Sequence, residues 1–421
     1  MDYVVLILIM FRFLKSFYCV FIISLLVPRL YKTSKLKVRN PTSMETKERT
    51  QIENDVCEET VRSVFENPLP MKSILNQLEC FDIQRLRTVN SAIRKCIDTL
   101  KPNPRIEKYE ILFNFTDNWN QIDVYVELES GEFKGSTYTT CESSFFINYE
   151  YFPAQSREEL CLNDFEATLR YQMSCMEELT IAYEYIERSS YIFGGKDNPY
   201  EELSKKTGEI LKRRAHPLKT RKISMGMRQT EMLGHISAVD SSFLKTIELF
   251  LPFDTFWIRY HDIKELPIEV DQLSQTDQWK NAEQLFSTLL AITTPIQKMN
   301  VLHFSVLEIL VETISSQDVD YLKTNLLKST TFQKFKISFR ETTIDESLHT
   351  LIGEPYSNFS SLKKVWYFQI QNTDYYIQID LDIRDVRNIE RNLIPKVIIF
   401  TRVPKEDAPF VELPINQLMI N

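Results

Sequence analysis

Glycine is scarce in this chain, with 8 residues among 421. So few glycines disfavour folds that cradle phosphates, because glycine-rich loops let the backbone approach the ligand closely. The only Gly-Gly pair, in the run Gly194-Gly195-Lys196, lacks the first glycine of a GxxxxGK[ST] motif, so we interpret it as a turn. We therefore expect no nucleotide or other cofactor.

Clusters of catalytic or metal-binding residues are also missing from the sequence. The 5 histidines stand apart, no HExxH motif occurs, and no GxSxG motif marks a serine nucleophile. The 7 cysteines are odd in number and form no CxxC pair, which favours a reducing compartment. We expect no catalytic residue, no metal site and no enzyme activity.

Excess positive charge is absent as well. The formal net charge is −8, whereas a general nucleic-acid binder needs a basic surface to meet phosphates. Hydrophobic residues make up 43% of the chain and charged residues 26%, which is typical of soluble globular proteins. The length leaves room for two or three domains, and we expect no nucleic-acid partner.

The N-terminus holds the longest apolar run, Val4 to Val27. It is long enough to cross a bilayer, although Arg12 and Lys15 interrupt it at a cost in free energy. Basic residues follow it, so a spanning helix would leave the rest of the chain in the cytosol by the positive-inside rule. A cleaved signal peptide fits less well, and a misplaced start is a third alternative.

The stretch from Asn67 to Leu100 shows helical periodicity in three short bursts. Pro70 suits the first turn of the first helix, Asp82 can cap the second, and Asn90 or Ser91 can cap the third. So small a unit buries little surface by itself, which suggests a partner helix.

This stretch resembles an F-box, in the form found in the nematode F-box A family. The similarity rests on Leu69-Pro70, Asp82-Ile83, Leu86-Arg87 and the apolar spacing, while Ile93 stands where many F-boxes carry tryptophan. The resemblance implies docking onto a Skp-type adaptor and, through it, onto a cullin of a ubiquitin ligase. It assigns adaptor binding to Leu69, Pro70, Ile74, Leu75, Leu78, Ile83, Leu86 and Val89.

Beyond Pro104 the apolar period changes from helical to alternating. We predict strands at 106–115, 122–128 and 144–149, which form a small antiparallel sheet. From Cys161 onward, helices and strands alternate with an irregular period, as in a β/α repeat related in shape to leucine-rich repeats. The predicted helices span 165–175, 200–214, 231–236, 307–313 and 319–327. The predicted strands span 179–183, 220–225, 244–250, 281–286, 299–303, 332–339, 363–370, 375–383 and 396–401.

The repeat region resembles the FTH domain of the same family, from about Asp164 to Pro404, through LKRRAHPLKTRKISM, DQWKNAEQLF and VWYFQIQNTDYYIQIDL. In that family the domain is taken to be a protein-interaction module. The predicted fold is therefore α+β: a three-helix F-box, a mixed sheet and a leucine-rich-repeat-like FTH domain. The expected organisation is an apolar segment (1–40), a linker (41–62), the F-box (63–103), a β-rich spacer (104–160), the FTH repeat (161–362) and a C-terminal sheet and tail (363–421).

One run of basic residues lies within the repeat region, between positions 212 and 222. It can serve as a nuclear import signal or bind an acidic partner, and the plainer interpretation is a basic helix C-terminus. The cluster consists of Lys212, Arg213, Arg214, Lys219, Arg221 and Lys222.

The two resemblances together imply a substrate-recruiting subunit of a Skp-cullin-F-box ubiquitin ligase, cytoplasmic or nuclear, whose target the sequence leaves open. One alternative is a scaffold that tethers proteins without degradation. Another is a membrane-anchored receptor whose main chain faces the cytosol, which requires residues 4–27 to be retained.

Overall fold

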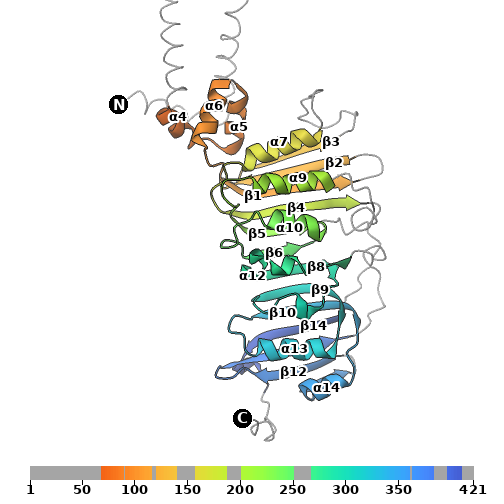
Figure 1. Cartoon of the computed structure of the whole chain (residues 1–421). Coiled ribbons are helices and arrows are strands. Elements are labelled where there is room, and N and C mark those ends of the chain that lie inside the picture. Colours follow the sequence, from red (N-terminus) through yellow and green to blue (C-terminus); the bar gives the residue numbers. More distant parts are fainter. Residues whose placement is uncertain are drawn as a thin grey trace, which may run out of the picture. The chain divides into compact units, whose positions relative to one another are not determined.

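The computed structural model describes residues 68–89, 91–115, 120–139, 157–186, 201–250, 267–360, 363–383 and 396–409. The apolar run at 4–27 and the strand predicted at 144–149 lie outside the described residues. The described chain consists of three short helices followed by a long mixed sheet with further helices packed on it (Figure 1). The predicted α+β class is confirmed.

The three-helix unit comprises α4 (Pro68–Leu75), α5 (Cys80–Val89) and α6 (Ser91–Leu100). Proline is tolerated in the first turn because the amides there have no partner inside the helix, which explains why α4 can begin with Pro68 and Pro70. The three helices share a small core of their own, formed by Met71, Leu75, Ile83, Ile93 and Ile97. The helix α5 begins at Cys80, so Asp82 lies in its first turn and the predicted cap at Asp82 is wrong.

One sheet contains 14 strands of the described chain. Its order is β11-β12-β13-β14-β10-β9-β8-β6-β5-β4-β1-β2-β3, with β7 paired beside β8. The strands are β1 (Ile106–Phe115), β2 (Asn120–Leu128), β3 (Phe133–Thr139), β4 (Met176–Ile186), β5 (Thr220–Gly226), β6 (Thr246–Leu249), β7 (Pro267–Ile268), β8 (Gln284–Ile292), β9 (Val306–Ile314), β10 (Lys334–Thr342), β11 (Ser357–Ser360), β12 (Lys363–Gln369), β13 (Tyr375–Asp382) and β14 (Lys396–Pro404).

The middle of the sheet is parallel, and its strand order follows the chain from β4 to β10. Antiparallel strands extend it at both ends, β2 and β3 beyond β1 and β14 to β11 beyond β10. The strands of the ranges 104–160, 161–362 and 363–421 therefore pair into one sheet. Each parallel strand buries one face against the connecting segments, as the repeat pattern predicts.

The helices that connect or flank these strands are α7 (Arg157–Leu169), α9 (Glu201–Lys212), α10 (Gln229–Ile236), α12 (Asp277–Asn281), α13 (Ser316–Leu326) and α14 (Ser347–Ile352). The described residues also form three single turns of 3-10 helix, at Leu273–Gln275, Ile296–Lys298 and Lys405–Asp407. Figure 1 shows α7, α9, α10 and α13 on the same side of the sheet.

Side-chain contacts place these helices on one face. The hydroxyl of Tyr138 (β3) donates to Asp164 of α7 at 2.6 Å, and Tyr183 (β4) donates to Glu231 of α10 at 2.8 Å. At the other end, the Lys323 ammonium of α13 lies 5.1 Å from the centroid of the Phe368 ring (β12). Because side chains alternate along a strand, the intervening residues point to the opposite face, which we call the open face.

Two sequence predictions in the repeat region are wrong. Residues 299–303 form no strand, and the predicted helix at 307–313 is the strand β9. Leu307, Ile309 and Val311 are buried at every second position and pair with strands on both sides. A short apolar run of this kind is compatible with either helix or buried strand, and here the two neighbouring strands decide it.

Other boundaries shifted or were missed. The helix predicted at 165–175 lies at Arg157–Leu169, and β3, β7, α12, α14 and β11 have no counterpart in the predictions. The strand β1 has the predicted bounds. Helix α14 ends at Ile352 and is capped by Gly353, whose φ of 92° suits glycine and whose carbonyl accepts a hydrogen bond from the indole of Trp366 at 2.9 Å.

Candidate protein-interaction surfaces

The first candidate surface is the outer side of the three-helix unit. Two of the residues predicted to bind an adaptor are exposed, Leu69 at 77% and Val89 at 44%. Four more are half-buried, namely Pro70, Ile74, Leu78 and Leu86. Of these, Ile74, Leu78 and Leu86 pack against the small core while keeping part of their surface accessible.

The remaining two predicted residues lie inside the unit. Leu75 is 2% exposed and Ile83 is 6% exposed, and both belong to the small core. Their side chains hold the helices together. A partner therefore does not contact them directly, and substituting them would affect adaptor binding through the folding of the unit.

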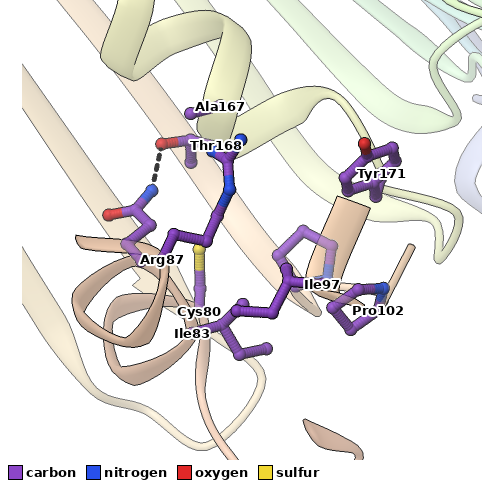
Figure 2. Close-up of a pocket in the computed structure, with 10 residues that line it drawn as sticks. Cys80, Ile83, Arg87, Ile97, Pro102, Ala167, Thr168 and Tyr171 are labelled. Atoms are coloured by element: carbon purple, nitrogen blue, oxygen red, sulfur yellow. Dashed lines mark hydrogen bonds between the residues drawn. The ribbon is translucent and has the colours of Figure 1, made fainter. Parts of the chain in front are cut away.

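One side of the three-helix unit is joined to the sheet domain through α7. The Gln84 amide of α5 donates to the Thr168 hydroxyl of α7 at 2.6 Å, the dashed bond to Thr168 in Figure 2. The Tyr171 hydroxyl lies 3.4 Å from the carbonyl oxygen of Asp98, to which it donates. Figure 2 shows Cys80, Ile83 and Ile97 on one side and Thr168 and Tyr171 on the other. These residues line a small cavity of about 20 Å³. That volume suits about one water molecule, so the cavity offers no room for a larger ligand.

The start of α5 belongs to the core of the sheet domain. Cys80 and Phe81 are 3% and 5% exposed and pack with the residues of that core, not with the small one. The Lys134 ammonium of β3 lies 4.6 Å from the centroid of the Phe81 ring, a cation–π contact. Burial raises the pKa of the Cys80 thiol to about 12, so this cysteine is an inert packing residue at neutral pH.

The predicted basic cluster is spread over different parts of the fold. Arg221 and Lys222 are neighbours on β5 and point to opposite faces: Arg221 pairs with Glu177 at 3.2 Å, and Lys222 with Glu178 at 3.0 Å. Arg214 donates to the carbonyl oxygen of Gln172, and burial lowers the pKa of this guanidinium to about 10. The ammonium of Lys219 lies over the Phe243 ring, while Lys212 and Arg213 are exposed.

The second candidate surface is the open face. The strand register brings a row of polar residues together across the sheet, which includes Glu127, Lys108, Glu178, Lys222, Thr246 and Gln284 in neighbouring strands. A second row lies two residues further along each strand on the same face. It contains Glu110, Thr180, Ser224, Glu248, Phe286, Glu308 and Lys336.

Ion pairs connect neighbouring strands on this face. The ammonium of Lys222 lies 3.0 Å from Glu178 and 2.6 Å from Glu248, and that of Lys336 lies 2.6 Å from Glu308. Their side chains keep between 27% and 37% of their surface exposed. Ion pairs this accessible stabilise a fold by about 0–1 kcal/mol each, so stability alone does not account for so many charges.

Sequence reasoning did not find the open face or the contact with α7. The open face had a local signal, the alternation of charged and apolar residues in segments such as LKTRKISMGM and TFQKFKISF. The contact with α7 had no local sequence signal, because Gln84 and Thr168 are 84 positions apart and neither belongs to a motif.

The fold and these surfaces define a protein with a three-helix unit and a β/α repeat sheet. Within it, residues 201–351 match the family model of the FTH domain. The match begins at the start of α9 and ends in α14, so it includes the strands β5 to β10. No curated protein and no solved structure matches the chain.

Across the ranges that the structure describes, no helix combines the length and the apolar character needed to cross a bilayer.

Proposed function

We propose that this protein is a substrate-recruiting subunit of a Skp-cullin-F-box type ubiquitin ligase. The observation that carries the proposal is the presence, on one chain, of a proline-led three-helix unit that resembles an F-box and of a segment that matches the FTH domain. In the family that the sequence resembles, these two parts occur together.

In this proposal the three-helix unit binds a Skp-type adaptor, which links it to a cullin. The partly accessible residues Leu69, Ile74, Leu78, Leu86 and Val89 make the contact, while Leu75 and Ile83 maintain the shape of the unit. Apolar side chains left half-exposed on short helices suit burial against a partner helix.

The chain itself supplies no catalysis in this proposal. The sheet domain binds a target protein, and the ligase brings the ubiquitin-carrying enzyme close to it, which raises the local concentration of target lysines. The complex works in the cytosol or nucleus, where its other subunits and reduced cysteines are found.

Adaptor binding tests the proposal. We expect Ile74→Lys combined with Leu78→Lys to abolish co-precipitation of a Skp-type adaptor with the full chain, because two charges would be buried without partners. Leu351→Lys is the matched control, since this leucine is 39% exposed and belongs to α14. Undiminished co-precipitation by the double variant would reject the proposed function.

A second measurement separates degradation from tethering. Proteins that associate with the wild-type chain should have longer lifetimes in cells that express the double variant. If adaptor binding is lost and no associated protein changes its lifetime, the scaffold alternative holds instead.

A further inference from the structure

The segments that lead into β1, β4, β5 and β6 lie side by side at one edge of the sheet. They are residues 101–105, 170–177, 212–221 and 240–245, and the first of them follows α6 directly. Hydrogen bonds join each segment to the next, between Asn103 and Met173, Gln172 and Arg214, Met176 and Lys219, and Arg221 and Lys245. The four segments therefore form one surface, which we call the basic edge.

The basic edge carries nine basic side chains but only two acidic ones, Glu177 and Asp240. Four of the nine lie outside the basic run at 212–222, so the fold adds charges that the run does not contain. Carboxylates pair with three of the nine, namely Arg170, Arg221 and Lys245. Among the described residues, no carboxylate pairs with the other six, which are Lys101, Arg105, Lys212, Arg213, Arg214 and Lys219.

The ends of nearby helices account for only part of this charge. The helices α6, α7 and α9 end at the basic edge, and each C-terminus carries about half a negative charge, so together they offset about one and a half cations. Arg214 keeps its charge at neutral pH, since burial lowers its pKa only to about 10. Its Nε and Nη1 atoms have no hydrogen-bond partner among the described residues. Because buried surroundings screen a charge weakly, the basic edge retains a positive field.

Two large apolar side chains are exposed on the basic edge. Met173, in the segment before β4, is 48% exposed, and Phe243, in the segment before β6, is 38% exposed. The strand β5 lies between β4 and β6, and the ammonium of Lys219 in the segment before it lies 4.8 Å from the centroid of the Phe243 ring. Since β4 and β6 are about 10 Å apart, one short ligand can reach cations and apolar side chains together.

We propose that the basic edge binds an acidic segment of a partner protein, in which carboxylates flank apolar side chains. The carboxylates pair with exposed cations such as Arg105 and Arg213, and the apolar side chains contact Met173 and Phe243. A protein suits this surface better than a nucleic acid, because the net charge of −8 repels a long polyanion and Met173 offers no ring on which a base can stack. The proposal rests on the proposed function only in identifying the partner as the target of the ligase.

The experiment measures fluorescence anisotropy of a labelled peptide of about 12 residues mixed with the full chain. The peptide contains glutamates on both sides of a leucine pair, with serine elsewhere. We expect saturable binding that weakens with salt, and at least about tenfold weaker binding to the variant that combines Arg105→Glu with Arg213→Glu. Met173→Gln should weaken binding by about threefold, and this loss should disappear with a peptide whose leucines are replaced by serine.

Matched controls make the result specific. Lys328→Glu with Lys334→Glu reverses the same number of exposed charges beside β10, outside the basic edge, and should bind within about threefold of wild type. A peptide with lysine in place of glutamate should not bind. Equal loss in both double variants, unchanged binding to the Arg105, Arg213 variant, or equal binding of the lysine peptide would each overturn the proposal. So would a single-stranded oligonucleotide that binds more tightly than the acidic peptide, since it would assign the edge to nucleic acid.

The outcome is independent of the adaptor assay. Peptide binding without adaptor binding would leave the basic edge as a binding surface and reject the ligase function. Adaptor binding without peptide binding would reject the basic edge as a binding surface and leave the ligase function in place.

Discussion

The side-chain amide of Gln84 donates to the hydroxyl of Thr168 at 2.6 Å, and this bond joins the three-helix unit to the helix α7 on the sheet. Beside it, Phe81 packs into the core of the sheet domain although it belongs to α5. The backbone amide of Met173 also donates to the side chain of Asn103 at 3.0 Å, which ties the segment after α7 to the segment after α6. These contacts connect the unit to the sheet along one side and leave its other side accessible.

Phe81 should be the strongest single contributor to this contact. We expect Phe81→Ala to lower the free energy of unfolding by about 3–5 kcal/mol, because a ring that is 5% exposed leaves a cavity. Gln84→Ala should cost about 1 kcal/mol through loss of one hydrogen bond. Urea denaturation followed by circular dichroism measures both.

The control for these variants is Leu69→Ala on the accessible side of the same unit. Its side chain is 77% exposed, so its effect on stability should stay within about 0.5 kcal/mol. A Phe81→Ala variant no less stable than Leu69→Ala would show that α5 does not pack into the sheet domain.

Much of the fold could be predicted from local pattern. Strand β1 has its predicted bounds because IEKYEILFNF contains enough aromatic and branched residues to favour a strand, and α9 differs from its prediction by only one or two residues at each end. Strand β9 was mistaken for a helix because Leu307, Ile309, Leu310 and Val311 satisfy both periods. Only pairing with β8 and β10 distinguishes a strand from a helix in this segment, and that information is not local.

The candidate surfaces were less predictable than the fold. Helical periodicity predicts the three-helix unit and the resemblance assigns its binding residues, yet neither could show that Leu75 and Ile83 point inward, since this depends on the angles between the helices. The basic run at 212–222 looked like one cluster because proximity in sequence suggests proximity in space. In a strand, however, neighbours such as Arg221 and Lys222 lie on opposite faces.

Two glycines in adjacent helices should respond in opposite directions to alanine. A Cβ on Gly208 of α9 would lie 3.3 Å from the backbone carbon of Gly234 in α10, whereas a Cβ on Gly234 would have no atom within 4 Å. Gly208→Ala should therefore destabilise the protein by about 1–2 kcal/mol, because α9 and α10 must move apart. Gly234→Ala should stabilise it by about 0.5–1 kcal/mol through helix propensity.

Thermal denaturation of both glycine variants at one pH tests this contrast. If Gly208→Ala also stabilises the protein, α9 and α10 separate more easily than their close approach indicates.

His235 should make the folded protein sensitive to acid. Burial lowers the pKa of this fully enclosed imidazole from 6.5 to about 4. Its Nδ1 donates to the carbonyl oxygen of Glu231 at 2.8 Å, and its Nε2 lies 2.9 Å from the Thr207 hydroxyl. Between pH 6.5 and 4 the unfolded chain binds this proton and the folded protein does not, so stability falls by about 3 kcal/mol as the pH decreases.

Comparison with His235→Asn isolates this effect. Glu231 acts in the opposite direction, because burial raises the pKa of its carboxyl group and so favours the folded state as that group takes up a proton. Denaturant midpoints measured from pH 7 to pH 4 should therefore fall less in His235→Asn than in wild type, even though the variant is less stable at pH 7. Parallel curves for the two proteins would contradict the assigned pKa.

Neighbouring residues of β10 should differ sharply in their contribution to stability. Ile337 is fully buried on the helix-covered face, whereas Lys336 is on the open face, 37% exposed and 2.6 Å from Glu308. Ile337→Ala should cost about 2–5 kcal/mol because it leaves a cavity, while Lys336→Gln should cost no more than about 1 kcal/mol because water screens the ion pair. Urea denaturation of the two variants measures the difference, and similar losses would mean that the open-face ion pairs are needed to hold the sheet together. If instead only Ile337→Ala is costly, charges on the open face can change with little effect on the fold, which is the condition under which a binding surface can acquire a new specificity.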